Sequence, residues 1–404
     1  MTKSTGITWA AASARRLERQ FLARRARTGT SVADVAAAML GVHAQVLSAA
    51  ELSVGLRADG VTRTDVRDAL WPTAPLAPPA PAPAPALVKT HGPRGTVHLL
   101  PARDLPMWCA ALPAIPAGPA AFPTDVRLTG EQAGQVVAAI ADALDGTFLT
   151  VDELGEEVVA RTGPWAGDLV MPAFQTMWPR WRQVLHRAGQ CGALSFGPNR
   201  GRRVTYTRPP RFTPLPPEEA SRLLVRRYLY AYGPATPLHF ARWLAAPPGW
   251  AKARYAELAA AGEIEEVRFE GAPAWVAAGD TAFPDAPERD ELLRGVRLLP
   301  YFDAYVVAAQ PRELLFPGAA YRRALAGGQA GNFPVLLVDG VAAGVWHQRR
   351  RGRRGRRTTV TVEPLARLTA RQERELADCV ERVGAVLEAA AELVIGEVTV
   401  GAHA

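Results

Sequence analysis

Several residue types and patterns are scarce in this chain of 404 residues, and each scarcity narrows what the protein can be. Only three cysteines occur, Cys109, Cys191 and Cys379, and their odd number and wide separation indicate no disulfide framework. No apolar run approaches the roughly 18 residues of a membrane-spanning helix. The first residues, MTKSTG, lack the apolar core of a secretory signal peptide. We therefore expect a protein of a reducing, cytoplasmic compartment that does not enter a membrane.

Motifs for common metal and nucleotide sites are also missing. The chain has neither a Cys-x-x-Cys pair nor a His-Glu-x-x-His sequence, which are spacings typical of zinc sites. It has no glycine-rich loop ending in lysine of the kind that cradles phosphates. The sequence thus predicts a function that uses no metal and no cofactor.

What the chain does have is a local excess of positive charge. Hydrophobic residues make up 48% and charged residues 21%, which is typical of globular protein, and the length suggests two to four domains. The formal charge is +8, from 47 Lys and Arg against 39 Asp and Glu. Seven arginines and two glycines fill positions 349–357, and removing these seven charges from +8 leaves +1. Such a concentration of charge indicates contact with a polyanion.

Two polar side chains lie inside an apolar run at positions 41–47, GVHAQVL. His43 and Gln45 are two residues apart, so an extended backbone would point both to one face, whereas a helix would turn them apart. From this spacing alone two interpretations stay open. One is a His and a Gln hydrogen-bonded inside a core, and the other is a functional pair.

The order of predicted elements repeats along the chain, and each round gives helices followed by a hairpin. The first round has helices over 32–40 and from 62 to 71, then strands over 87–91 and 96–100. The second has helices over 129–144, from 151, and over 172–188, then a wing-like turn at 197–201. The third has helices over 217–231, 237–244 and 250–261, then strands over 264–269 and 274–277. This is the element order of a winged-helix domain, and its recurrence favours an internal repeat.

The pattern changes after residue 287. Short β-prone runs follow at 296–299, 304–307, 335–338, 342–345 and 358–362, then a helix over 369–390 and a last strand over 394–400. Strands at 344–347 and 359–362 flank the arginine run, which predicts a hairpin tip. We therefore predict an α+β fold of four domains. These are residues 1–122 with a Pro/Ala spacer at 72–86, residues 123–211, residues 212–286, and a β-rich domain at 287–404 with an arginine-rich hairpin over 346–360.

Several motifs resemble those of a known family, the winged-helix DNA glycosylases of the AlkZ and YcaQ type. They are HAQ at 43–45 with SVGLR at 53–57, GPRGTVH at 92–98, RYL at 227–229 with YGPAT at 232–236, LLPYFD at 298–303, and VDG at 338–340 with GVW at 344–346. Together they cover nearly the whole chain in consistent order. The resemblance implies three tandem winged-helix domains and a β-barrel-like C-terminal domain, arranged as a C-shaped clamp around double-stranded DNA. A clamp within one chain favours a monomer.

The catalytic motif of that family is a polar–apolar–polar triplet, often Gln-x-Gln or Gln-x-Asp, and here it is His43-Ala44-Gln45. Its first position departs from the commonest form. The resemblance also implies action on N7-alkylated purines, which predicts excision of bulky or crosslinked guanine adducts in DNA repair. Some members protect antibiotic producers from their own DNA adducts, so a role in self-resistance is a further expectation.

The chemistry of an N7-alkylguanine needs little acid help, because the base is already cationic and leaves readily. Gln45 can accept a hydrogen bond from a water through its amide oxygen, and a neutral His43 can hold that water or take its proton. Nothing in the chain resembles a Schiff-base lysine motif, so we expect base excision without strand cleavage. Bulky adducts are hard to rotate out of the stack, so we also expect excision without full extrusion of the base.

Other polar residues are candidates for DNA contact or for structural roles. Arg57 is expected either to contact a phosphate or to pair with Glu51, for which a surface or capping role is expected. His91 is a candidate DNA contact, whereas His98 is expected to be structural and Asp303 to be a buried hydrogen-bond acceptor. The hairpin arginines are expected to contact the minor groove or flanking phosphates, with a solvated loop as the alternative; they are Arg349, Arg350, Arg351, Arg353, Arg354, Arg356 and Arg357.

Two alternative functions involve DNA without chemistry. A winged-helix transcriptional regulator needs a basic recognition helix, and the predicted helix over 250–261 offers only Lys252 and Arg254. A lesion-binding protein that shields DNA would differ from an enzyme only in having no use for His43 and Gln45.

Overall fold

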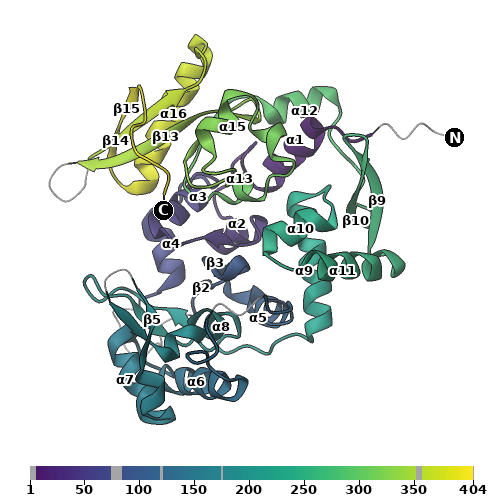
Figure 1. Ribbon diagram of the computed structural model, residues 1–404. Coiled ribbons are helices and arrows are strands. Elements are labelled where there is room, and N and C mark those ends of the chain that lie inside the picture. Colours follow the sequence, from purple (N-terminus) through teal and green to yellow (C-terminus); the bar gives the residue numbers. More distant parts are fainter. Residues whose placement is uncertain (1–5, 74–83, 119–121, 174–175, 352–356, 404) are drawn as a thin grey trace.

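Helices and short, mostly antiparallel sheets alternate along the chain (Figure 1). The computed structural model describes residues 6–73, 84–118, 122–173, 176–351 and 357–403. Most of the predicted Pro/Ala spacer lies outside these ranges, as do Arg353, Arg354 and Arg356. Within them, no helix is both long and apolar enough to cross a lipid bilayer.

The first unit has the order helix, strand, two helices and hairpin. Its elements are α2 (Val32–Ala38), β1 (Val42–His43), α3 (Leu47–Gly55), α4 (Arg63–Leu70), β2 (Leu87–His91), a 3-10 turn (Pro93–Gly95) and β3 (Val97–Pro101). Ser31 caps α2 by accepting a hydrogen bond from the Asp34 amide, as predicted. Left-handed φ values at Leu40 and Gly41 then reverse the chain into β1. As a result β1 pairs with β3, which lies in the middle of the sheet.

The second unit repeats this order but contains an additional hairpin. Its elements are α6 (Gly130–Ala143), β4 (Leu149–Thr150), α7 (Val151–Thr162), a 3-10 turn (Pro164–Gly167), β5 (Leu169–Pro172), β6 (Met177–Pro179), a 3-10 helix (Arg180–Val184), α8 (Leu185–Gln190), β7 (Ser195–Phe196) and β8 (Thr205–Thr207). The single helix predicted over 172–188 is wrong. Pro179 would fall in its interior, where proline lacks the amide hydrogen and its ring clashes with the preceding turn. The chain instead forms the β5–β6 hairpin before α8.

The third unit matches the predicted elements closely. They are α9 (Pro217–Tyr232), α10 (Pro237–Leu244), α11 (Pro248–Ala260), β9 (Ile264–Phe269) and β10 (Ala272–Ala277). Each helix begins at a proline, whose missing amide hydrogen costs nothing in the first turn. Ala235 forms a short bridge to Trp275 of β10, so in this unit too the last strand lies between the other two segments.

The last domain is a curled five-stranded sheet, resembling half of a barrel, in the order β11-β12-β13-β14-β15. Its elements are α12 (Ala286–Leu293), β11 (Val296–Leu299), α13 (Ala304–Ala308), α14 (Arg312–Leu315), α15 (Ala319–Ala324), β12 (Val335–Val338), β13 (Val341–Arg351), β14 (Arg357–Pro364), α16 (Ala370–Leu387) and β15 (Ala390–Ile395). The strand predicted over 304–307 is wrong, because Asp303 caps a helix there by accepting from the Tyr305 amide. The last strand also begins earlier than predicted, since a left-handed residue, Glu388, ends α16.

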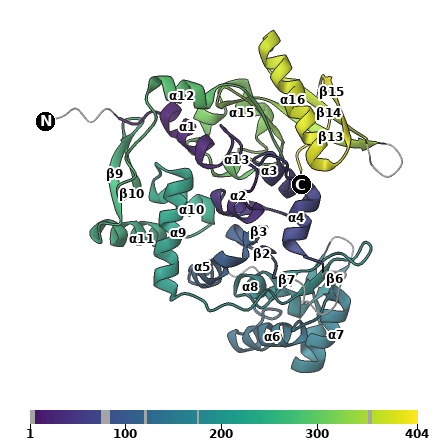
Figure 2. The ribbon, with the colours of Figure 1, turned by 180° about the vertical axis from the view of Figure 1, so that it is seen from behind.

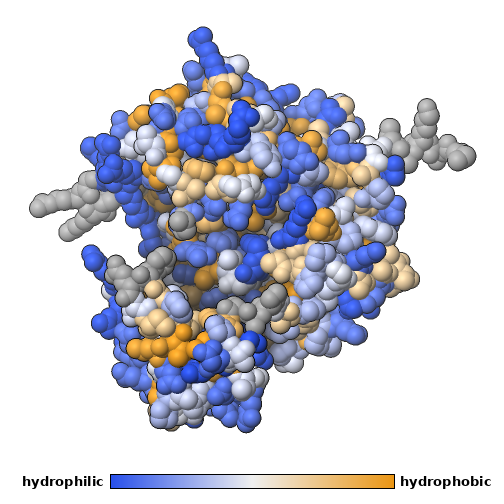
Figure 3. Space-filling model, in the orientation of Figure 1, coloured by the Kyte–Doolittle hydropathy of each residue, from blue (hydrophilic) through white to orange (hydrophobic). Residues whose placement is uncertain are grey.

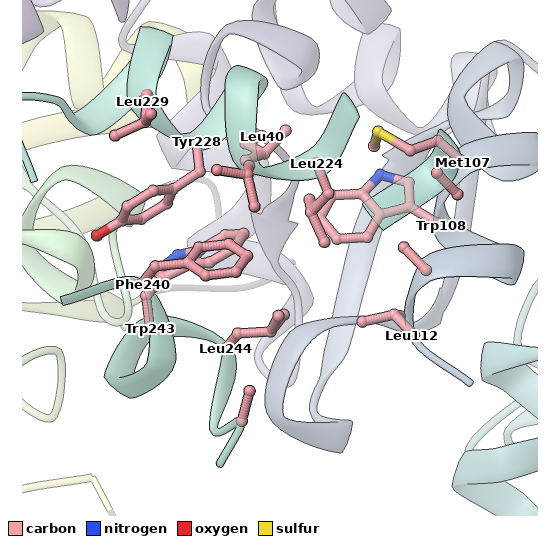
Figure 4. Packing of buried hydrophobic residues seen from close by; sticks show 14 of the residues in the cluster. Leu40, Met107, Trp108, Leu112, Leu224, Tyr228, Leu229, Phe240, Trp243 and Leu244 are labelled. Atoms are coloured by element: carbon pink, nitrogen blue, oxygen red, sulfur yellow. The ribbon is translucent and has the colours of Figure 1, made fainter. Parts of the chain in front are cut away.

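Two helices connect these units instead of belonging to one of them. Helix α1 (Trp9–Arg19) comes before the first unit in sequence, but it lies beside α12 of the last domain (Figure 2). Helix α5 (Leu105–Ala111) brings Trp108 into a core that it shares with Leu40 of the first unit and with Tyr228 and Trp243 of the third (Figure 4). The first and third units are therefore joined by one continuous hydrophobic core.

The second unit is a separate lobe with a core of its own around Trp181. It meets the first unit where β2 contacts α8 and β7, and there Thr90 Oγ1 donates to the Leu194 carbonyl over 2.8 Å. In the space-filling view the face is hollowed between this lobe and the body above it (Figure 3). The site described below lies in the body that forms one side of this hollow.

A buried ion pair ties the first unit to the last domain. Arg57 follows α3, and its two terminal nitrogens donate to the two carboxylate oxygens of Asp303 over 2.7 and 2.8 Å. Both side chains are 0% exposed. Asp303 also accepts from Ser53 Oγ over 3.0 Å. The predicted buried acceptor role of Asp303 is confirmed.

We predict that Asp303→Asn destabilises the protein by about 3–5 kcal/mol, because it leaves the Arg57 charge buried without its partner. Urea or thermal denaturation measures the effect. The double variant Arg57→Met/Asp303→Leu, which removes both charges, is expected to be more stable than the single variant. Glu291→Gln is the matched control, since its pair with Arg24 is exposed. Equal stability of Asp303→Asn and the unmodified protein would contradict this role of the pair.

Candidate active site

His43 is held on a short strand at the edge of a sheet. It pairs with His98 across β1 and β3, and the Ala44 amide continues the ladder by donating to the Val97 carbonyl over 2.7 Å. His43 is 8% exposed, and its Nδ1 is buried with no hydrogen-bond partner among the described residues. The backbone is thus extended at His43, so of the two conformations considered for this segment the helix is excluded there.

His98 supports His43 from the neighbouring strand. Its ring lies edge-on to that of His43, with centroids 5.2 Å apart. Its Nδ1 is 2.9 Å from the Thr96 carbonyl oxygen, and because a carbonyl can only accept, this nitrogen carries the hydrogen. A Cβ atom at Gly92 would lie 2.9 Å from the His98 ring, which explains the glycine at this position. The predicted structural role of His98 is confirmed.

Gln45 and His43 line the same cavity, which has a volume of about 480 Å³. Gln45 is exposed and lies just before α3, where the chain leaves the sheet. The cavity walls come from the first unit, the third unit and the last domain, so it forms only when all three are folded together. Across the described ranges, no three His, Cys, Asp or Glu side chains gather closely enough to share a metal ion.

Phe302 forms the wall behind His43. The two rings lie 4.4 Å apart between centroids and are inclined by 32°. Phe302 adopts a left-handed φ of 55°, which is strained for a residue with a side chain, and its amide donates to the Gly331 carbonyl over 2.8 Å. The next residue is Asp303, so the ion pair with Arg57 holds this loop and keeps Phe302 against His43.

His43 is neutral over the whole physiological pH range. Its pKa is lowered to about 3, mainly by burial and also by the nearby Arg94 and His403 side chains. A neutral imidazole keeps one ring nitrogen as an acceptor. Such a group can accept a hydrogen bond from a water molecule, but it is a weak base at this pKa.

Two predicted roles of charged residues near the motif need correction. Arg57 contacts neither a phosphate nor Glu51, because its charged end is enclosed and paired with Asp303. Glu51 is buried instead of exposed or capping. It accepts from Arg67 Nε over 2.6 Å, with Arg63 at 3.4 Å, and burial raises its pKa despite these partners.

His91 also differs from its predicted role as a DNA contact. Its ring packs on the second unit, where a Cβ atom at Gly189 would lie 2.4 Å from its Nδ1 and where the Phe196 ring lies 5.6 Å away. Burial lowers the pKa of His91 to about 4. A neutral ring enclosed between two units offers little to DNA, so we no longer expect His91 to contact it.

The described part of the arginine run lies on β13 and β14, which pair as antiparallel strands. Arg349, Arg350 and Arg351 extend β13 and pair with Thr359, Thr358 and Arg357 of β14. The four arginines among these residues are exposed. Strands β13 and β14 extend away from the rest of the molecule (Figure 1), and their four exposed arginines face solvent.

Sequence reasoning missed several residues of the site. Phe302 lies in the LLPYFD motif, but no sequence pattern assigned it a role in the site. His403 lines the cavity, with its ring 5.4 Å from that of Phe302, and it is 360 positions from His43 in a stretch without any motif. Arg94, Arg242 and Arg312 line the cavity as well. Among these arginines only Arg94 lies in a motif, GPRGTVH.

A comparison with protein families identifies the class to which this fold and site correspond. Residues 36–386 match the family model described as DNA glycosylase AlkZ-like. The chain therefore belongs to the AlkZ-like family of DNA glycosylases.

Individual relatives give the same result. Over 352 residues the chain is 32% identical to a Streptomyces sahachiroi protein named interstrand DNA cross-link repair glycosylase, covering 84% of this chain and 87% of that protein. The fold of the present chain is similar to the solved structure of the Streptomyces sahachiroi DNA glycosylase AlkZ, with a TM-score of 0.71 and 27% identity. That match covers 96% of this chain and 100% of the other.

The lowered pKa of His43 predicts a pH dependence of stability. The pKa is near 6.5 in the unfolded chain but about 3 in the fold, so only the unfolded chain takes up a proton between these values. The contribution of neutral His43 to the free energy of unfolding is fully present above about pH 6.5 and is lost as the pH falls toward 3. His43→Gln cannot take up this proton, so its denaturation midpoint is expected to fall less than that of the unmodified protein between pH 7 and pH 5. Gln135→Ala, at an exposed residue that does not titrate, serves as control. Parallel curves for His43→Gln and the unmodified protein would contradict the assignment.

Proposed function

We propose that this chain is a monofunctional DNA glycosylase that hydrolyses the N-glycosidic bond of N7-alkylated guanine, in particular of bulky or crosslinked adducts. The observation that carries the proposal is the placement of His43 and Gln45 on one cavity of a chain in the AlkZ-like family. The relative named for interstrand cross-link repair supports crosslinked DNA as a substrate.

The reaction breaks the bond between C1′ of the sugar and N9 of the base. The bonding electrons go to the cationic base and neutralise it, which makes it a good leaving group without protein help. A water oxygen then bonds to C1′ and its proton passes to solvent. Gln45 can accept from this water through its amide oxygen, and His43 through its free ring nitrogen. With a pKa of about 3, His43 is better suited to orient the water than to keep its proton.

The residues around the cavity support hydrolysis without strand cleavage. Strand cleavage by a glycosylase of the other type needs a lysine amine that bonds to C1′. Of the two lysines within the described ranges, Lys89 and Lys252, neither lines the cavity. Lys89 instead lies 4.9 Å from the centre of the Phe196 ring on the second unit.

We further propose that the three repeated units are winged-helix domains that clamp double-stranded DNA in the hollow of Figure 3. The lobe of the second unit and the arginine hairpin would then lie on either side of the duplex, with a monomer sufficient for binding. The exposed arginines of β13 and β14 would contact flanking phosphates or the minor groove. Protection of a producer from its own DNA-damaging product remains a prediction of the family resemblance.

Release of free base from a duplex that carries one N7-alkylguanine tests the proposed activity. The unmodified protein is expected to release the base and leave an alkali-labile abasic site, with methyl and with bulky adducts as separate substrates. His43→Ala and Gln45→Ala are each expected to slow single-turnover release by roughly 10²–10⁴-fold. His43→Gln is expected to stay within about tenfold of the unmodified protein, because an amide can also orient water.

Two variants at exposed positions, His186→Ala and Gln135→Ala, serve as matched controls and are expected to leave the rate unchanged. No release from any adduct would reject the enzyme and favour a protein that only binds DNA. Full activity of both His43→Ala and Gln45→Ala would place the chemistry elsewhere.

The hairpin predicts a measurable salt dependence of DNA binding. Replacing Arg349 and Arg351 by Gln is expected to weaken binding and to reduce the slope of log affinity against log salt by about 0.9 for each phosphate that the protein no longer neutralises. Deleting positions 349–357 is expected to flatten the slope further. Arg226→Gln/Arg268→Gln, which removes two exposed charges from the third unit, is the matched control. An unchanged slope in the hairpin variants would mean that the hairpin is a solvated loop.

A further inference from the structure

Three arginines from three parts of the chain line the cavity that contains His43 and Gln45. Arg94 lies in the 3-10 turn of the first unit, Arg242 on α10 of the third unit, and Arg312 at the start of α14 in the last domain. They are separated widely in sequence, so their convergence is a property of the fold.

None of the three has a carboxylate partner within the described part of the chain, although many other arginines of this protein form ion pairs. Arg94 Nη1 donates to the Trp243 carbonyl over 2.6 Å, and Arg312 Nη1 donates to the Gly328 carbonyl. These carbonyls hold the side chains in place but do not neutralise them. Burial lowers the pKa of Arg94 to about 10, and repulsion from Arg312 adds to the effect.

The other polar residues around the cavity do not supply negative charge either. They are hydrogen-bonding groups without a carboxylate among the described residues, namely Thr96, His239, Gln310, Gln329, Asn332 and His403. Arg94 also holds a left-handed φ of 61°, a strained conformation that the surrounding structure must maintain. The cavity is therefore an electropositive pocket beside the catalytic pair.

The positive charge of the pocket determines whether it can bind the base or the backbone phosphates of the lesion nucleotide. An N7-alkylguanine base is a cation, and like charges held close together in a partly buried site repel each other. The backbone phosphates on either side of the lesion nucleotide are anions, and arginine binds phosphate through paired, charge-assisted hydrogen bonds. The pocket is thus suited to the backbone and unsuited to the base.

We propose that this pocket binds the backbone phosphate next to the lesion nucleotide, through Arg94, Arg242 and Arg312, and so places C1′ of its sugar against His43 and Gln45. The inference rests on the proposed function, because it assigns a part of that substrate. It also gives a physical reason for excision without extruding the base into the protein. The three arginines are positioning residues, since they hold the phosphate and take no part in the bond changes.

A double-mutant cycle between protein and DNA tests the proposal. The probe is a duplex with a tetrahydrofuran abasic site, in which the linkage on the 5′ or the 3′ side is either a normal phosphate or a neutral methylphosphonate. Fluorescence anisotropy gives the dissociation constant for the unmodified protein, Arg242→Gln and Arg242→Gln/Arg312→Gln. Arg94 is left unchanged because, besides its bond to the Trp243 carbonyl, it holds a left-handed backbone φ that a substitution could disturb. Because Arg242 is exposed, its substitution is expected to leave the fold intact.

For the unmodified protein we expect one of the two neutral linkages to weaken binding by roughly 10- to 100-fold, as for loss of a charge-assisted hydrogen bond. In the double variant the same linkage is expected to weaken binding severalfold less than in the unmodified protein, since Arg94 alone of the three arginines is left to contact it. A methylphosphonate six linkages away and the variant Arg226→Gln are controls that should show no coupling. Additive losses at both flanking linkages would overturn the proposal.

Base release separates this proposal from its rivals. If Arg242→Gln/Arg312→Gln slowed release of a bulky adduct but not of N7-methylguanine, the pocket would hold the adduct's substituent, and the phosphate assignment would be overturned. Because the binding cycle uses a product analogue and needs no catalysis, its outcome is independent of the activity assay. An unmodified protein that releases no base would overturn the proposed function even if the cycle showed coupling.

Discussion

The ion pair between Arg57 and Asp303 is the contact on which the site depends. It joins residues 246 positions apart, and neither side chain reaches solvent. A buried pair of this kind tolerates no loss of one partner, because the remaining charge would be left without water or counter-charge. Through it, the end of α3 is fixed to the loop that carries Phe302. The ring that backs His43 is therefore held by a segment from the far end of the chain.

The electrostatics of the site follow from what surrounds His43 and Gln45. No carboxylate lines the cavity among the described residues, and burial together with nearby positive charge keeps His43 neutral. Such a site would serve poorly for a substrate that needs a strong acid or base. It suits a substrate whose leaving group is already activated by its own positive charge, so that the protein only has to hold water and backbone. The same positive walls that suppress protonation of His43 would attract the phosphates.

The sequence predicted much of this architecture for local reasons. These features depend on only a few neighbouring residues. They are caps such as Ser31, the prolines at the starts of α9 to α11, and the spacing of His43 and Gln45. No single helix forms over 172–188, because Pro179 would lie in its interior. The β-prone run after Asp303 failed because one side-chain cap decided for a helix.

The parts of the site that were not predicted are those that depend on distant segments. Neither predicted role of Arg57, a phosphate contact or a pair with Glu51, was right, because its partner Asp303 lies in another domain. His403 and Arg312 reach the cavity only after the last domain has packed on the first unit. His91 has the residue type of a DNA contact, but the second unit covers it, and no local pattern shows which face of a strand a neighbouring domain will occupy.

The central claim is that His43 and Gln45 jointly hold the hydrolytic water at C1′ of a nucleotide that stays near the duplex. The most direct measurement is a crystal structure of the protein bound to DNA that carries a cationic 1′-aza sugar, a mimic of the oxocarbenium-like transition state. We predict a water within about 2.6–3.2 Å of both Gln45 Oε1 and a ring nitrogen of His43, facing the charged position of the sugar. A sugar bound away from this pair, or a lesion base extruded into the cavity between Arg94 and Trp243, would contradict the account.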